Sequence, residues 1–225
     1  TRQTAALTTA QVRSLTTDQI EALTTDQVGA LTSAQVAALT TTQIRALELA
    51  DVAVLTASQV TALTTEQAIA LTTAQIGALT TVQVAALATD DLAVLTTAQI
   101  VALSTAQVQV LSASQIAALT TAQIVAVSTA QVQALTTQQI AEGLNTADIG
   151  ALSTRQVAAL STAQIRVLST EQLNALGSEQ VAALTTGQVA SLSTASGSAS
   201  GVATVHIRSC PDSITASRSC AQVVR

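Results

Sequence analysis

The sequence predicts an all-α fold: a solenoid of short capped helices, one per eight residues, followed by a small non-helical C-terminal tail. Three observations predict it. Leucine recurs every eight residues from Leu7, a Thr-x-x-Gln pattern follows almost every leucine, and the residue after the glutamine is nearly always Val or Ile. Repeats this short bury their apolar faces only against their neighbours, so they indicate a stacked architecture.

The composition excludes several classes of protein. The 225 residues are 48% hydrophobic but only 9% charged, with net charge −5 and no aromatic residue, whereas ordinary domains carry about 25% charged residues. Thr or Gln interrupts every apolar run before it reaches the roughly 18 residues of a membrane span, so we expect none. Every basic residue is Arg, and there are only eight. We therefore expect no nucleic-acid partner either.

The repeating unit has the consensus Leu-Thr-Thr-Ala-Gln-(Val/Ile)-Ala-Ala. The repeat region spans residues 1–192 and contains 23 full units, from Leu7 to Ser191, and a truncated one. Val127 is the one replacement of the leucine, and one unit of nine residues, Leu135 to Gly143, precedes Leu144. In a continuous helix this repeat would drift by about 80° per unit, and in a strand its Leu and Val/Ile would lie on opposite faces. Neither uninterrupted element fits the pattern.

The start of each unit predicts the start of a helix. In the first unit Thr8 is a preferred N-cap, and Gln11 completes a Thr-x-x-Gln capping box. Leu7 and Val12 then occupy the two positions of a hydrophobic staple. A helix that ends before the next Leu-Thr is far shorter than the roughly 12–15 residues that are marginal alone, so stacking must hold it.

Some units depart from the consensus. Aspartate replaces the glutamine at Asp51, Asp91 and Asp148, which keeps an acceptor near the helix N-terminus, where negative charge is favoured. The N-cap Thr or Ser is replaced at Glu48, Ala88 and Gly177, and conservatively at Asn145. We expect Glu48, Ala88 and Gly177 to mark the weaker corners.

The staple residue carries a second, slower period. Every third unit, counted from the first, has valine there: Val12, Val36, Val60, Val84, Val108, Val132, Val157 and Val181. This period predicts three short helices per superhelical turn, a 24-residue coil of roughly triangular section in which equivalent units stack above one another.

The repeat pattern stops before the C-terminus. Residues 193–201 have the Ser/Gly composition of a linker, and in the tail 202–225 the residues Val202, Val205 and Ile207 suggest a short strand that could join neighbouring copies. Cys210 and Cys220 either close a small disulfide loop, which would be worth about 3 kcal/mol and suit an extracellular setting, or remain free thiols.

No pattern of catalytic, cofactor-binding or metal-ligating residues is present. The single histidine, His206, has no clustered partners, and no nucleophile elbow or phosphate-binding glycine loop occurs. We therefore expect no enzyme activity and no cofactor. The remaining feature is the Thr/Ser pair in nearly every unit, which either only caps helices or also forms a regular hydroxyl face for ice or glycans.

Two resemblances follow from these residues. The stretch Leu7 to Leu15 resembles the first short helix of the TAL effector repeat, but the second helix and the base-reading loop have no counterpart, so no DNA binding is implied. Residues 7–191 resemble the Thr/Ala-rich octapeptide-repeat regions of large secreted or cell-surface bacterial proteins. That resemblance implies a structural or adhesive role outside the cell.

Together these patterns predict a non-enzymatic extracellular repeat protein, namely a stalk, a spacer or a filament subunit that associates end to end. The alternative is an ice- or glycan-binding protein that uses the Thr/Ser face. A third reading, a peptide-binding solenoid, is weakened by the lack of aromatic anchors.

Overall fold

The computed structural model describes residues 2–195, and all regular structure in this part is helical. It comprises twenty-four short helical segments that form three rows along the molecule. In each row the helices are separated in sequence by about one 24-residue coil. The predicted all-α architecture with one helix per eight residues is confirmed.

The first row contains α1 (Arg2–Ala5), α4 (Thr25–Gly29), α7 (Leu49–Val54), α10 (Thr73–Ala78), α13 (Thr97–Ala102), α16 (Thr121–Ala126), α18 (Thr146–Ala151) and α21 (Thr170–Asn174). The second row contains α2 (Thr9–Arg13), α5 (Ser33–Ala38), α8 (Ala57–Thr61), α11 (Thr81–Ala85), α14 (Thr105–Gln109), α17 (Thr129–Ala134), α19 (Thr154–Ala159) and α22 (Ser178–Ala182). The third row contains α3 (Thr17–Glu21), α6 (Thr41–Ala46), α9 (Thr65–Ala70), α12 (Thr89–Val94), α15 (Ala113–Ala118), the π-helix η1 (Gln139–Gly143), α20 (Thr162–Arg166) and α23 (Thr186–Ala195).

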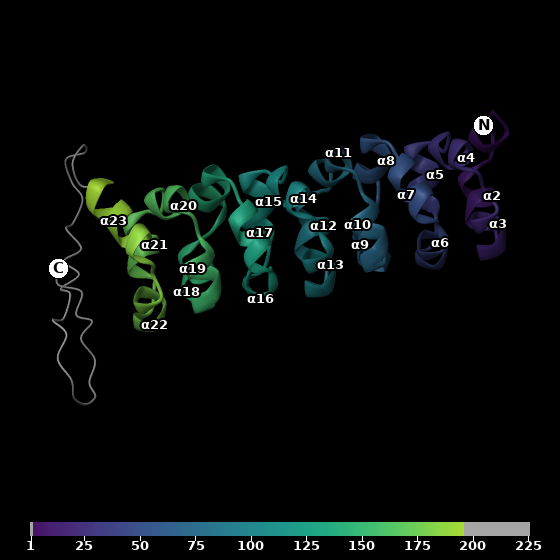
Figure 1. Cartoon of the computed structure of the whole chain (residues 1–225). Helices are drawn as coiled ribbons and strands as arrows, with labels where there is room; N and C mark the ends of the chain where they lie inside the picture. The colour runs from purple at the N-terminus through teal and green to yellow at the C-terminus, as the bar shows by residue number, and fades with distance from the viewer. Residues whose placement is uncertain (1, 196–225) are drawn as a thin grey trace.

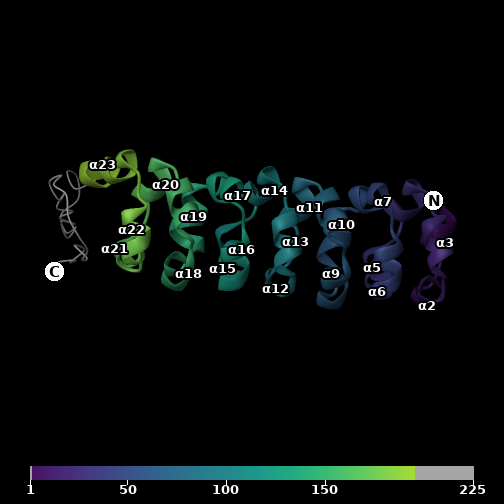
Figure 2. The same ribbon diagram turned by 60° about the horizontal axis from the view of Figure 1, so that its bottom comes forward.

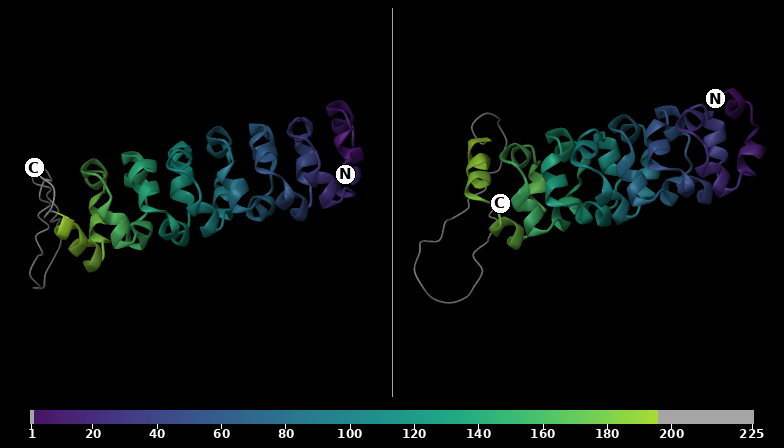
Figure 3. Two further views of the ribbon diagram at one scale, coloured as in Figure 1. Left: turned by 90° about the horizontal axis from the view of Figure 1, so that it is seen from above. Right: turned by 45° about the vertical axis from the view of Figure 1, so that its right-hand side comes forward.

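Three helices make one turn of the solenoid. Each helix packs against the helix three places away in the chain, as α7 packs against α4 and α10, and α14 against α11 and α17. Successive turns are layered along one axis, with the first and last turns at opposite ends of an elongated molecule (Figures 1, 2 and 3). The predicted coil of three helices is therefore confirmed.

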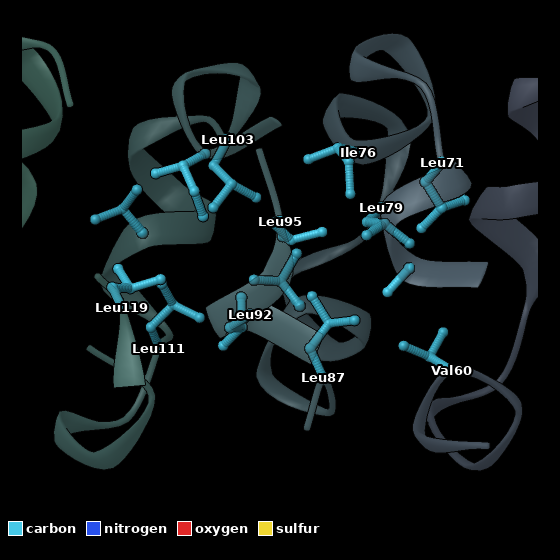
Figure 4. Close-up of a cluster of buried hydrophobic side chains, with 14 of the residues drawn as sticks. Val60, Leu71, Ile76, Leu79, Leu87, Leu92, Leu95, Leu103, Leu111 and Leu119 are labelled. Atoms are coloured by element: carbon cyan, nitrogen blue, oxygen red, sulfur yellow. The ribbon is translucent and has the colours of Figure 1, made fainter. Parts of the chain in front are cut away.

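The core is a narrow apolar column inside the coil. From Val12 to Ile165 no staple residue is more than 5% exposed, and the leucines that open most units are buried beside them. Figure 4 shows such leucines, for example Leu79, Leu95 and Leu103, gathered inside the coil together with Ile76 and Leu92. Leucine and the staple residue thus fill the interior, as the staple pattern predicts.

The nine-residue unit is accommodated by a wider helical turn. Its extra residue is absorbed in η1, which keeps the following helices in their rows. The π-turn brings Gly143 against the preceding coil, where a Cβ atom would lie 2.8 Å from Cβ of Ile116. A cavity of about 20 Å³ adjoins this unit, and its lining includes Leu135 and the smaller Val127. Because its walls are almost entirely apolar, it offers no set of partners for a water molecule.

The last helix differs from the others. Helix α23 runs past Leu192 to Ala195, so it includes residues 193–195, which the sequence suggested as the start of a linker. The physical reason is that Ser196 stands where the next glutamine is expected, so the capping box that would start a new helix is incomplete. The proposed strand residues Val202, Val205 and Ile207, and the cysteines Cys210 and Cys220, lie outside the described residues.

Candidate functional site

The capping boxes form as the sequence predicts. In α11, Gln83 N–H donates to Thr80 Oγ1 at 3.3 Å, and Thr80 N–H donates back to Gln83 Oε1 at 2.6 Å. Most other helices repeat this pair of bonds. The side-chain cap is missing at Glu48, Ala88 and Gly177, the three positions where the sequence lacks a capping side chain.

The same glutamines make a second set of bonds that the sequence analysis missed. Gln83 Nε2 donates to the carbonyl oxygens of Val52 and Leu55, at 2.7 and 2.6 Å. These carbonyls lie at the C-terminal end of α7 and in the corner that follows it, in the preceding turn of the solenoid. The side-chain amide of Gln83 thus binds two helices. Its oxygen accepts a hydrogen bond at the start of α11, and its nitrogen donates to carbonyls at the end of α7.

This arrangement is repeated along the whole molecule, and we call it the glutamine ladder. It comprises Gln35, Gln43, Gln59, Gln67, Gln75, Gln83, Gln99, Gln107, Gln115, Gln123, Gln131, Gln139, Gln156, Gln164, Gln172, Gln180 and Gln188. In each, Nε2 lies 2.6–2.8 Å from the carbonyl oxygen of a residue that opens a unit in the previous turn. All are at most 6% exposed. Burial of so many amides is stable only because each is bonded on both sides.

A signal for the ladder was present in the sequence. A capping box accepts Glu as readily as Gln, and the helix dipole favours Glu at this position. Yet no unit has Glu there. A carboxylate has no N–H to donate, so the presence of Gln in twenty of the 23 units indicates that most units need a donor.

Two of the aspartates interrupt the ladder. Asp51 and Asp91 are 2% and 3% exposed, and Oδ2 of each has no hydrogen-bond partner among the described residues. Burial raises the pKa of both carboxyls above the ordinary value; the negative charge of Glu48 adds to this at Asp51 and that of Asp90 at Asp91, while backbone N–H groups act in the opposite sense. At positions 51 and 91 a carboxyl group, which accepts hydrogen bonds, therefore stands where most other units have an amide N–H donor.

The third aspartate is satisfied differently. Asp148 accepts from Asn145 N–H at 3.2 Å with one oxygen and from Thr121 Oγ1 at 2.8 Å with the other. Thr121 belongs to α16, in the previous turn, so this bond also ties two turns together. The equivalent residues below Asp51 and Asp91, Thr25 and Thr65, are exposed and make no such bond in the described structure.

The ladder has free groups at its first turn. Gln11 and Gln19 are exposed, and within residues 2–195 their amide nitrogens donate to no carbonyl, although their Oε1 atoms accept from their own N-caps at 2.8 and 2.9 Å. In the last turn the carbonyls of Leu176 and Leu184 receive no glutamine bond from this part of the chain. Within the described residues, the ladder therefore presents donors at one end and acceptors at the other.

Over residues 2–195, no group of three or more His, Cys, Asp or Glu side chains is placed to hold a metal ion. No helix in the same range is long and apolar enough to cross a membrane.

These features define a class: an α-solenoid repeat protein whose turns are joined by buried side-chain amides. The family model of the ALTTAQ repeat matches residues 1–33, 44–81, 84–121, 143–178 and 162–194. These segments cover more than half of the sequence, and the chain belongs to the ALTTAQ repeat family. No curated protein matches the chain. The predicted Thr/Ala-rich octapeptide repeat is confirmed, whereas its origin in secreted or cell-surface bacterial proteins stays a prediction.

Proposed function

We propose that this chain is a non-enzymatic structural protein that works outside the cell as a stalk, a spacer or a filament subunit. The observation that carries the proposal is the glutamine ladder, which joins successive turns from Gln35 to Gln188 and among the described residues is interrupted only at Asp51, Asp91 and Asp148. Such a stack resists bending because each turn is tied to its neighbour by both apolar contacts and buried hydrogen bonds.

The proposal is tested by the length of the particle. Eight turns spaced by a helix-packing distance of roughly 8–10 Å give a rod on the order of 70 Å. Duplicating residues 71–94, one full turn, is expected to lengthen the rod by about 9 Å without changing its width. Small-angle X-ray scattering measures both quantities. A compact or flexible particle would contradict a spacer role.

End-to-end association is part of the proposal. The free amides of Gln11 and Gln19 in one copy match the carbonyls of Leu176 and Leu184 in another, and the half-buried leucines at both ends offer apolar area. A contact between two different ends does not close on itself, so it generates filaments.

Association is measured by sedimentation velocity and electron microscopy of the full chain. Gln11→Glu/Gln19→Glu keeps the acceptors of the capping boxes but removes the donors, so it is expected to weaken association at least about tenfold. Gln109→Glu/Gln133→Glu changes two exposed glutamines outside the ladder and is the control. Monomers at every concentration would contradict the filament role and leave the spacer role standing.

The extracellular setting rests on the resemblance to secreted repeats and on Cys210 and Cys220. We expect these cysteines to form a disulfide in protein isolated from its natural source. Mass spectrometry after thiol alkylation under non-reducing conditions counts the free thiols. Two alkylated cysteines would argue against the oxidising compartment that the proposal requires.

An ice- or glycan-binding role is favoured by one observation. In the third row an exposed threonine is the first residue of most helices, in the order Thr17, Thr41, Thr65, Thr89, Thr162 and Thr186. The neighbouring Thr and Ser hydroxyls cap helices, but these threonines are not used as N-caps. Thermal hysteresis that Thr65→Lys/Thr89→Lys abolishes would support this role. Its absence in the unmodified chain would remove ice binding.

A further inference from the structure

Asp51 and Asp91 place negative charge inside a cluster of oxygen atoms. A ladder glutamine reaches the carbonyls 31 and 28 residues before it, as Gln83 reaches Val52 and Leu55. By the same register, the carbonyls of Ile20 and Leu23 are the ones that a glutamine at position 51 would reach. The carboxylate brings no donor to them, and its Oδ2 is buried without a partner.

The register gives Asp91 the same surroundings. The carbonyls 31 and 28 residues before it belong to Val60 and Leu63, and Oδ2 of Asp91 is again buried and unpartnered. The two units lie in different rows, α7 in the first and α12 in the third. The oxygen cluster therefore arises twice, in separate parts of the solenoid.

The length of the aspartate side chain decides what can lie between Oδ2 and the carbonyl oxygens of the preceding turn. Aspartate is shorter than glutamine by one carbon–carbon bond of about 1.5 Å, so Oδ2 stops roughly 4 Å from carbonyls that a ladder amide reaches at 2.6–2.8 Å. That gap is too long for an O–H···O bond. An ion that lies about 2.3–2.6 Å from each oxygen can bridge a gap of this order.

The charge around the cluster also favours a cation. Glu48 lies beside Asp51 at the start of α7, Asp26 lies in α4 beneath it, and Asp90 precedes Asp91 in the sequence. α10, which packs on the other side of α7, carries no charged residue. Around Asp91, α9 contributes Glu66 and α15 contributes no charge. Every charged side chain on these helices is acidic.

We propose that Asp51 and Asp91 each hold a hard divalent cation of the Ca²⁺ type between Oδ2 and the carbonyl oxygens of the preceding turn. The ion supplies the positive charge that the glutamine amide supplies elsewhere, so it replaces two missing rungs of the ladder. Carboxylate and carbonyl oxygens are the ligands that Ca²⁺ takes in flexible geometry, whereas Mg²⁺ demands a near-octahedral shell. The inference does not depend on the proposed function, because it concerns binding within a single chain.

The test uses the full chain, stripped of metal with a chelator, at neutral pH. Ca²⁺ is expected to bind at two sites per chain in isothermal titration calorimetry. At a Ca²⁺ concentration well above Kd it is expected to raise the Tm by about 2–4 °C per site. Mg²⁺ at the same concentration is expected to give a smaller shift.

Variants decide where the ion binds. Asp51→Gln/Asp91→Gln restores the amide donors and is expected to remove both the binding heat and the Tm shift, while each single variant keeps one site. Glu171→Gln/Glu179→Gln removes the same charge from two exposed glutamates in α21 and α22 and is expected to keep both sites.

Two outcomes would overturn the proposal. One is a Ca²⁺ shift that survives in Asp51→Gln/Asp91→Gln, because the ion would then bind elsewhere. The other is a Tm that responds to pH but to no cation, because the carboxyls would then be held in the protonated form.

Discussion

At the scale of single residues, the glutamine at the fifth position of each unit has two roles. Its oxygen caps the helix to which it belongs, and its nitrogen binds the carbonyls of the preceding turn. The amide supplies an acceptor and a donor from the same planar group, whereas a carboxylate supplies only acceptors. This requirement explains why glutamine recurs along the chain where glutamate would satisfy the capping box alone.

Gln83→Glu tests this requirement. The substitution keeps the bond from Thr80 N–H but removes the donors to Val52 and Leu55 and buries a charge beside them. We expect the free energy of unfolding to fall by about 2–3 kcal/mol or more, measured by urea denaturation. Gln11→Glu is the matched control, because its amide makes no inter-turn bond in the described chain and its carboxylate stays exposed. Equal effects at both positions would refute the second role.

The opposite substitution can be made at Asp51 and Asp91, where a glutamine would restore the amide donor. In metal-free protein, replacing either by Gln is expected to raise the free energy of unfolding by about 1–3 kcal/mol, because an unpaired buried acceptor becomes a bonded amide. Thermal unfolding followed by circular dichroism measures the change. A loss of stability in Asp51→Gln would mean that the corner does not admit a longer side chain.

The raised pKa of both carboxyls fixes a pH dependence. A folded-state pKa above the unfolded one means that the folded chain binds protons more tightly, so stability increases as pH falls through the folded pKa and stops increasing below the unfolded value near 3.9. We expect metal-free protein to become more stable on mild acidification. The difference between it and Asp51→Gln/Asp91→Gln should shrink over the same range. A difference that stays constant with pH would contradict titration of these groups.

At the scale of the helix, the structure solves the problem of elements too short to be stable alone. The N-terminal amides of most helices are bound by their own Thr or Ser and Gln, and the C-terminal carbonyls by a glutamine from the next turn. A helix of five residues such as α11 thereby has both ends satisfied. The bond to the C-terminal carbonyl comes from a residue far along the chain. For Val52 the donor is Gln83, 31 positions later.

The π-helix is the element under the tightest steric constraint. In Gly143→Ala the new Cβ would lie 2.8 Å from Cβ and Cγ2 of Ile116, so α15 or η1 must move. We expect a loss of about 1–3 kcal/mol in the free energy of unfolding. Gly187→Ala, whose Cβ would only touch Thr162 Cγ2 at 3.9 Å, is the control. It is expected to be neutral or to stabilise by up to about 1 kcal/mol. Equal tolerance at the two glycines would show that η1 yields easily.

At the scale of the whole molecule, each turn formed by residues 2–195 contacts only the turns before and after it among these residues. Stability is therefore a sum of local terms, and the ends lack half of their partners. We expect amide hydrogen exchange to be slowest in the central turns, for example in α11–α14, and fastest in α2 and α3, whose glutamines lack inter-turn bonds in the described chain. Mass spectrometry of peptides resolves this gradient. Uniform protection along a monomer would contradict it.

The sequence by itself determined the local structure. The capping box fixes where each helix begins, the next Leu-Thr fixes where it must end, and the recurrence of valine at every third staple predicts three helices per turn. These signals are readable because they act within one unit or repeat at a constant spacing. For the same reason the missing caps at Glu48, Ala88 and Gly177 could be predicted individually.

Only the tertiary structure decided what the glutamines do between turns. Their amide nitrogens meet carbonyls that are distant in sequence, and nothing within one octad shows that those atoms become neighbours. The same distance hid the unpartnered oxygens of Asp51 and Asp91, which as capping residues look conservative. It also hid the contact of Gly143 with Ile116. Local bonds follow from adjacent residues, whereas bonds between turns exist only once the coil has closed and placed one turn on another.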